Sequence, residues 1–245
     1  MRVGVYVDAF NLYYGMRGIC GRGSAGWRWL DVRALAAALC GWTDSFVDRV
    51  VYCTARVDAG DSPGAYADQD VYLKALRGHA SIDVLELGRY VAWPKKVPLA
   101  NESKNGRAQL IVPTGAEAWS PELPIYRKSN GIGDDVLLAT VRMREEKGSD
   151  VNVATHLLAD IFQQTVDAAI VVSNDSDLAL PLRVARTQVP VGTVNPGSKP
   201  LAGALRGRRT DGPGGHWWKN LTAQHYYPHQ LPDPVAGRWY RPTGW

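Results

Sequence analysis

The chain has 245 residues, 45% of them hydrophobic, which excludes an unstructured polymer and allows one large domain. Its net charge of +4 is uneven: from Pro196 onward there are seven Lys/Arg against two acids, so residues 1–195 sum to −1. No apolar stretch reaches the roughly 18 residues of a membrane span and the N-terminus does not resemble a signal peptide, so we expect a cytoplasmic protein without membrane contact.

Apolar runs alternate with helical patterns along the first ninety residues. The β-branched runs predict strands at Val3–Val7, Arg49–Ala55 and Ile82–Leu87. Helical spacing predicts one helix from an Asp31 cap through Leu39 and another over Ala65–His79. This alternation is typical of a parallel, doubly wound α/β sheet.

The alternation stops between about 94 and 135, where proline and glycine are concentrated. We interpret this stretch as an inserted, loop-rich excursion with the character of a β-hairpin. The expected elements that follow are a strand at Val136–Met143, a helix at about 150–163, a strand at 168–172, a helix at about 178–188 and a strand at Val189–Val194. The sequence therefore predicts one domain over 1–195 with an insertion at about 94–135.

Residues 196–245 form a basic, aromatic extension that contains Trp217, Trp218, Trp239 and Trp245. Basic and aromatic side chains together suit contact with RNA, for which Arg206, Arg208 and Arg209 are the candidates. A Trp- and Pro-rich strap packed on the domain explains the same composition equally well.

Acidic side chains follow two of the predicted strands. Asp8 ends the first strand, and Asp175 and Asp177 follow the strand at 168–172. In open parallel sheets ligands bind beyond the carboxyl ends of the strands, so these acids are expected to converge. Asp150 is a fourth candidate at a predicted helix start, where an N-cap role explains it as well.

Clustered carboxylates repel one another unless a cation lies among them. Ligands that are all oxygen suit Mg²⁺ or Mn²⁺, and such a metal can activate water against a phosphodiester. The chemistry expected from these acids is therefore metal-assisted phosphoryl hydrolysis.

Three ordered motifs resemble those of the NYN domain, a branch of the PIN-like nuclease superfamily. They are Asp8-Ala-Phe-Asn11, the stretch 146–152 and the stretch 173–178. The resemblance implies a PIN-like, Rossmann-like α/β/α sandwich and an Mg²⁺- or Mn²⁺-dependent ribonuclease, with endonuclease action favoured. It places the metal-binding and catalytic acids at Asp8, Asp150, Asp175 and Asp177, and the supporting polar groups at Asn11, Ser173 and Asn174.

Other features leave alternatives open. Lys128 and Lys147 are candidates for a phosphate path towards an RNA partner, and a local cap explains Asn11 as readily as a contact to Asp8 or phosphate. His156 and Asp160 share a polar helix stripe that we interpret as a solvated face. The alternative to a ribonuclease is an RNA- or protein-binding module with little or no activity. A homo-oligomer and a regulatory protein partner both remain open.

Overall fold

The computed structural model describes residues 1–103, 105–114, 119–128 and 135–245. These residues form two compact units, one made of 1–90 with 146–245 and the other of 91–145. None of the helices in these ranges is long and apolar enough to cross a membrane.

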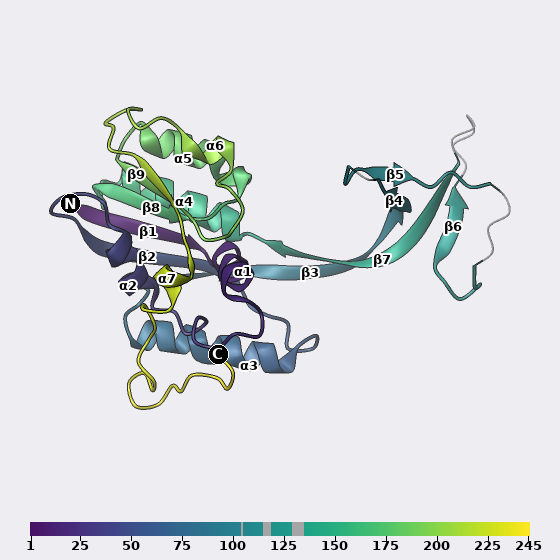
Figure 1. Cartoon of the computed structure of the whole chain (residues 1–245), viewed down its shortest axis with the longest axis horizontal. Coiled ribbons are helices and arrows are strands. Elements are labelled where there is room, and N and C mark those ends of the chain that lie inside the picture. Colours follow the sequence, from purple (N-terminus) through teal and green to yellow (C-terminus); the bar gives the residue numbers. More distant parts are fainter. Residues whose placement is uncertain (104, 115–118, 129–134) are drawn as a thin grey trace. The chain divides into compact units, whose positions relative to one another are not determined.

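The first unit is built on parallel strands in the order β10-β9-β8-β1-β2-β3. Their bounds are β1 (Arg2–Asp8), β2 (Phe46–Ala55), β3 (Val84–Pro98), β8 (Ala168–Val172), β9 (Val191–Asn195) and β10 (Trp217–Asn220). β1 is central, between β8 and β2 (Figure 1). The strand order reverses between β1 and β8, which is where such sheets form their ligand crevice.

Helices cover both faces of this sheet (Figure 1). Because side chains alternate along a strand, Val5 and Val7 of β1 face one layer and Tyr6 faces the other. The first layer holds α1 (Ala9–Cys20), α2 (Val32–Leu39), α3 (Pro63–Gly78) and α7 (Ala223–Tyr226). The second holds α4 (Ser149–Phe162), the 3₁₀ helix η1 (Ser176–Leu178), α5 (Ala179–Arg186) and α6 (Gly203–Arg206).

The general α/β fold with a mostly parallel sheet is therefore confirmed, and its predicted strands and helices form close to their expected positions. Helix α1, strand β10 and the short helices α6 and α7 were not predicted. Helix α1 starts directly behind β1, with the Asp8 side chain accepting a hydrogen bond from Asn11 N as its N-cap. Strand β10 adds the pair Trp217 and Trp218 to the edge of the sheet.

The second unit contains the predicted excursion at 94–135. In it β4 (Ala100–Glu102) and β5 (Ala108–Leu110) pair antiparallel, and β6 (Ile125–Lys128) pairs antiparallel with β7 (Val136–Lys147). The chain returns to the first unit close to where it left. Gly88 lies so near the returning strand that a Cβ at this position would be 2.5 Å from Lys147 O. A side chain at residue 88 would therefore push the two strands apart.

The segment from Pro196 onward contributes side chains to the core of the first unit. Tyr226, Leu231 and Val235 are buried in the cluster around Val5 and Val7. The Trp29 indole donates a hydrogen bond to Pro232 O at 3.0 Å. These contacts join the segment to the sheet on which it packs. The domain boundary near residue 195 remains a prediction.

Candidate functional site

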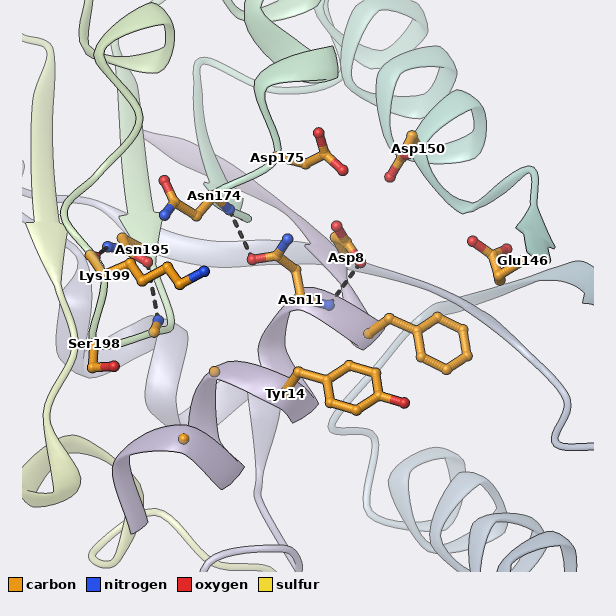
Figure 2. A pocket seen from close by; sticks show the side chains of 14 residues that line it. Asp8, Asn11, Tyr14, Glu146, Asp150, Asn174, Asp175, Asn195, Ser198 and Lys199 are labelled. Carbon is orange, nitrogen blue, oxygen red and sulfur yellow. Dashed lines mark hydrogen bonds between the residues drawn. The ribbon is translucent and has the colours of Figure 1, made fainter. Parts of the chain in front are cut away.

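A pocket of about 540 Å³ opens at the carboxyl ends of β1, β8 and β9 (Figure 2). It lies at the reversal of strand order, as expected for a parallel sheet. Four segments of the first unit supply its walls: the start of α1, the junction of β7 and α4, the turn after β8, and the loop after β9. The lining residues are Asp8, Phe10, Asn11, Tyr14, Gly15, Gly18, Glu146, Asp150, Asn174, Asp175, Asn195, Gly197, Ser198 and Lys199.

Asp8 is the most enclosed acid of the pocket, with 4% of its surface exposed. Its Oδ1 accepts a hydrogen bond from Asn11 N, and its Oδ2 accepts one from Ser173 Oγ, both at 3.0 Å. Burial raises the pKa of Asp8, the charges of Asp175 and Glu146 add to this, and the two hydrogen bonds oppose it. Both oxygens of this carboxyl are therefore engaged within the protein.

Asp150 lies in the first turn of α4, whose N-cap is Gly148 with a φ of 104°. The sequence alternative that made Asp150 an N-cap is therefore wrong. Burial raises the pKa of Asp150 to about 6, and the charges of Asp8, Asp175, Glu146 and Asp177 raise it further. A carboxyl with this pKa exchanges its proton near neutral pH, which is what a general acid or base requires.

Asp175 and Asp177 have different positions, although they are one residue apart. Asp175 lines the pocket and its Oδ1 accepts a hydrogen bond from Asp177 N at 3.0 Å, which caps η1. Asp177 is exposed and does not line the pocket; only its charge reaches Asp150.

The fourth acid of the wall is Glu146, which the sequence analysis did not single out. It ends β7 within a run of charged residues, and its Oε1 accepts hydrogen bonds from Ser149 N at 3.2 Å and Ser149 Oγ at 2.9 Å. The proximity of Gly88 lets this side chain reach the pocket, since a Cβ there would lie 2.4 Å from Glu146 Oε1. No local sequence signal distinguishes Glu146 from its neighbour Glu145.

Amide side chains hold the wall opposite the acids (Figure 2). Asn174 N donates to Asn11 Oδ1 at 2.9 Å, and Asn174 Oδ1 accepts from Ala202 N at 2.7 Å. Asn195 is fully buried and its Nδ2 donates to Lys199 O at 2.6 Å. These bonds connect α1, the turn after β8 and the loop after β9 into one frame.

The face of α1 turned to the pocket carries Phe10, Tyr14, Gly15 and Gly18. Phe10 packs edge-on against Tyr90 with ring centroids 5.7 Å apart, and Tyr14 is 59% exposed. Gly15 lets the helix approach the loop after β9, because a Cβ there would lie 2.6 Å from Pro196 O.

The remaining predicted site residues do not line the pocket. Ser173 lies behind it as a donor to Asp8, and Lys128 belongs to β6 of the second unit. Lys147 ends β7, and Arg206, Arg208 and Arg209 follow or end α6 on the exposed surface. Arg209 stacks on Trp218, with its guanidinium 5.3 Å from the ring centroid.

Comparison with known proteins gives one curated relative. No family model matches the chain, so the NYN resemblance rests on its three motifs and stays a prediction. The chain is 27% identical over 266 residues to the 6-hydroxy-3-succinoylpyridine 3-monooxygenase of Pseudomonas putida, which covers 99% of this chain and 73% of that protein. A solved protein of unknown function from Vibrio parahaemolyticus is 15% identical with a TM-score of 0.46, covering 91% of this chain and 93% of that one.

The named relative overturns the predicted function. A monooxygenase is an oxidoreductase, so the predicted Mg²⁺- or Mn²⁺-dependent ribonuclease, a hydrolase, is wrong, as is the alternative of an RNA- or protein-binding module. Among the residues that the structure describes, no group of three or more His, Cys, Asp or Glu side chains is arranged to hold a metal ion. Burial and the neighbouring acids raise the pKa values of Asp8 and Asp150, and protonation of either carboxyl relieves the repulsion between them. The prediction of an RNA partner depended on ribonuclease activity and is therefore no longer supported.

The first strand–helix turn does not fit a dinucleotide cofactor, which many oxidoreductases bind at this place in a parallel sheet. The turn has no glycine, and the Asp8 carboxyl itself occupies the position at the helix N-terminus that a diphosphate would need. Gly21–Gly26 has the G-x-G-x-x-G spacing, but it follows helix α1 instead of a strand. A diphosphate group is therefore not accommodated at this turn.

Proposed function

We propose that the chain is a small-molecule oxidoreductase of the monooxygenase class, with the pocket at the ends of β1 and β8 as its active site. The observation that carries the proposal is the similarity to a named 6-hydroxy-3-succinoylpyridine 3-monooxygenase along 99% of the chain. A pocket of about 540 Å³ lies within the range that small-molecule sites occupy.

The proposed substrate is a hydroxylated aromatic ring that carries an acid group, by analogy with the substrate in the relative's name. Monooxygenation places one atom of O₂ on the ring and releases the other as water, and it consumes two electrons and two protons. A reduced nicotinamide nucleotide can supply the electrons. What this chain's own residues contribute is binding, orientation and the handling of protons.

Asp150 is the proposed proton acceptor. With a pKa of about 6 it can take the proton from a ring hydroxyl at neutral pH, and the resulting oxyanion makes the neighbouring ring carbon richer in electrons. Asp8 is a positioning residue, because its two oxygens are occupied by Asn11 N and Ser173 Oγ. The exposed Tyr14 ring offers a flat surface beside the pocket.

The finer fold assignment also remains a proposal. A parallel sheet with helices on both faces would suit the PIN-like sandwich implied by the three sequence motifs. The proposed oxidoreductase activity does not depend on that assignment.

The test is incorporation of labelled oxygen. The protein is incubated with 6-hydroxy-3-succinoylpyridine or a simpler hydroxypyridine acid, ¹⁸O₂ and a reduced nicotinamide nucleotide, with and without added flavin. Mass spectrometry should detect one ¹⁸O atom in the ring product. Asp150→Asn should lower the rate about 100-fold, which is typical of losing a general base.

Asp48→Asn is the matched control, because Asp48 is an exposed acid of β2 that does not line the pocket. It should retain the wild-type rate. Absence of labelled product from the wild-type protein under all these conditions would remove the proposed function.

A further inference from the structure

The two sides of the pocket differ in hydrogen-bonding character (Figure 2). One side presents carboxyl groups, from Asp8, Glu146, Asp150 and Asp175. The other presents donors, from Ser198 and Lys199. The Asn11 amide lies between the two sides, with its oxygen towards Asn174 and its nitrogen towards the acids (Figure 2). A ligand that fills the pocket therefore meets acceptors at one end and donors at the other.

The orientation of the Asn11 amide is settled by its partner. Asn11 Oδ1 accepts a hydrogen bond from the backbone amide of Asn174 at 2.9 Å, and a backbone N–H can only donate. The Nδ2 group of Asn11 must therefore be the end that is left to the pocket. In the described part of the chain no acceptor is bonded to this Nδ2.

Lys199 is held at the rim by its backbone, not by its charge. The buried Asn195 donates to Lys199 O at 2.6 Å and accepts from Gly197 N at 3.0 Å, which shapes the loop after β9. The Lys199 side chain extends towards Asn11 in Figure 2. Across residues 1–103, 105–114, 119–128 and 135–245, no carboxylate pairs with its ammonium group, although four acids line the same pocket.

We propose that the side of the pocket formed by Lys199 and Ser198 binds the carboxylate of an aromatic acid whose ring hydroxyl faces Asp150. The assignment of a ring hydroxyl rests on the proposed function. An unpaired ammonium beside a hydroxyl donor suits a singly charged carboxylate. A doubly charged phosphate would be repelled more strongly by the four acids across the pocket.

The test is calorimetric titration without O₂ or reductant, so that only binding is measured. The probes are 6-hydroxypyridine-3-carboxylate and its carboxamide, which share the ring and hydroxyl and differ in the charged group. The acid should bind the wild-type protein about tenfold more tightly than the amide, as expected for one charge-assisted hydrogen bond. Lys199→Gln should remove that preference and leave the affinity for the amide unchanged.

Two further variants complete the design. Lys219→Gln is the charge-matched control, because Lys219 is an exposed residue of β10 outside the pocket, and it should keep the wild-type preference. Asn11→Asp keeps an oxygen for Asn174 N and adds a negative charge between the two sides of the pocket, so it should weaken binding of the acid. Thermal unfolding followed by circular dichroism establishes that each variant is folded.

Equal affinities for acid and amide, an unaltered preference in Lys199→Gln, or no binding of the acid at millimolar concentration would overturn the proposal. Its failure is distinguishable from failure of the proposed function. A protein that prefers the acid through Lys199 but incorporates no oxygen would retain this binding polarity and lose only the oxygenase activity.

Discussion

The hydroxyl of Ser173 donates a hydrogen bond to Asp8 Oδ2 at 3.0 Å. Ser173 Oγ in turn accepts a hydrogen bond from Asp175 N at 3.1 Å. One side chain thereby ties the last residue of β1 to the turn after β8, in the place where the strand order reverses. The acid wall of the pocket depends on this connection.

Ser173→Ala should lower the free energy of unfolding by about 1–2 kcal/mol, because it removes the hydrogen-bond partner of both Asp8 Oδ2 and Asp175 N. It should also raise the pKa of Asp8 further, since one of the hydrogen bonds that favour the ionised form is lost. Urea denaturation at neutral pH measures the first effect and carbon NMR titration the second. Ser176→Ala, an exposed serine of η1, is the control; equal stability of the two variants would contradict the role of Ser173.

Asp150→Asn should make the protein more stable at pH 7.5. The pKa of Asp150 is raised in the folded state from 3.8 to about 6, so the folded state binds the proton more tightly than the unfolded one. Stability contributed by this group is therefore present below pH 3.8 and lost as the pH rises towards 6. Allowing for solvent screening of a partly exposed group, the gain at pH 7.5 is about 1 kcal/mol. The melting temperature measured from pH 3.5 to 7.5 should fall less steeply for the variant; parallel curves would contradict the raised pKa.

Gly15→Ala and Gly18→Ala should have opposite effects, although both lie in α1 and line the pocket. A Cβ at residue 15 would lie 2.6 Å from Pro196 O, whereas one at residue 18 meets nothing within 4 Å. We expect Gly15→Ala to cost about 1–3 kcal/mol through overpacking. Gly18→Ala should stabilise the helix by up to about 1 kcal/mol. Chemical denaturation decides; a neutral Gly15→Ala would mean that the helix does not approach the loop so closely.

Leu231→Ala should destabilise the protein by about 2–4 kcal/mol, because this side chain is 4% exposed in the core under β1. Leu180→Ala is its control, since Leu180 is 58% exposed on α5 and should change stability by less than about 0.5 kcal/mol. The comparison tests whether the C-terminal segment packs into the core. A loss for Leu231 as small as that for Leu180 would show that it does not.

The sequence predicted the sheet well because strand periodicity and chain order determine it. Helix α1 was not predicted because Gly15 and Gly18 lower its helix propensity. A glycine is needed at residue 15 because the helix backbone lies against residue 196 there. The prediction of a solvated polar face on α4 was wrong for Asp160, because its partners also lie far away in the sequence. Asp160 is 4% exposed, where a solvated face was expected, and it accepts a hydrogen bond from Tyr6 at 2.9 Å and pairs with Arg49 at 3.0 Å.

The site was predicted in part. Strand ends at Asp8 and Asp175 were enough to place two acids in one pocket, and Asp150 joined them from α4. The opposite wall could not be predicted, because Asn195 and Lys199 acquire their positions only when the loop after β9 folds against α1. The inference of a metal was wrong because residue types alone do not tell whether neighbouring acids share a cation or a proton.

The segment 91–145 leaves and re-enters the first unit at nearly the same point, since the backbones at Gly88 and Lys147 lie within one side chain of each other. A short turn between β3 and β7 would close the chain there. The segment is thus a cassette: it can lengthen, shorten or be exchanged in evolution or by engineering while the four strand-end segments that build the pocket stay in register.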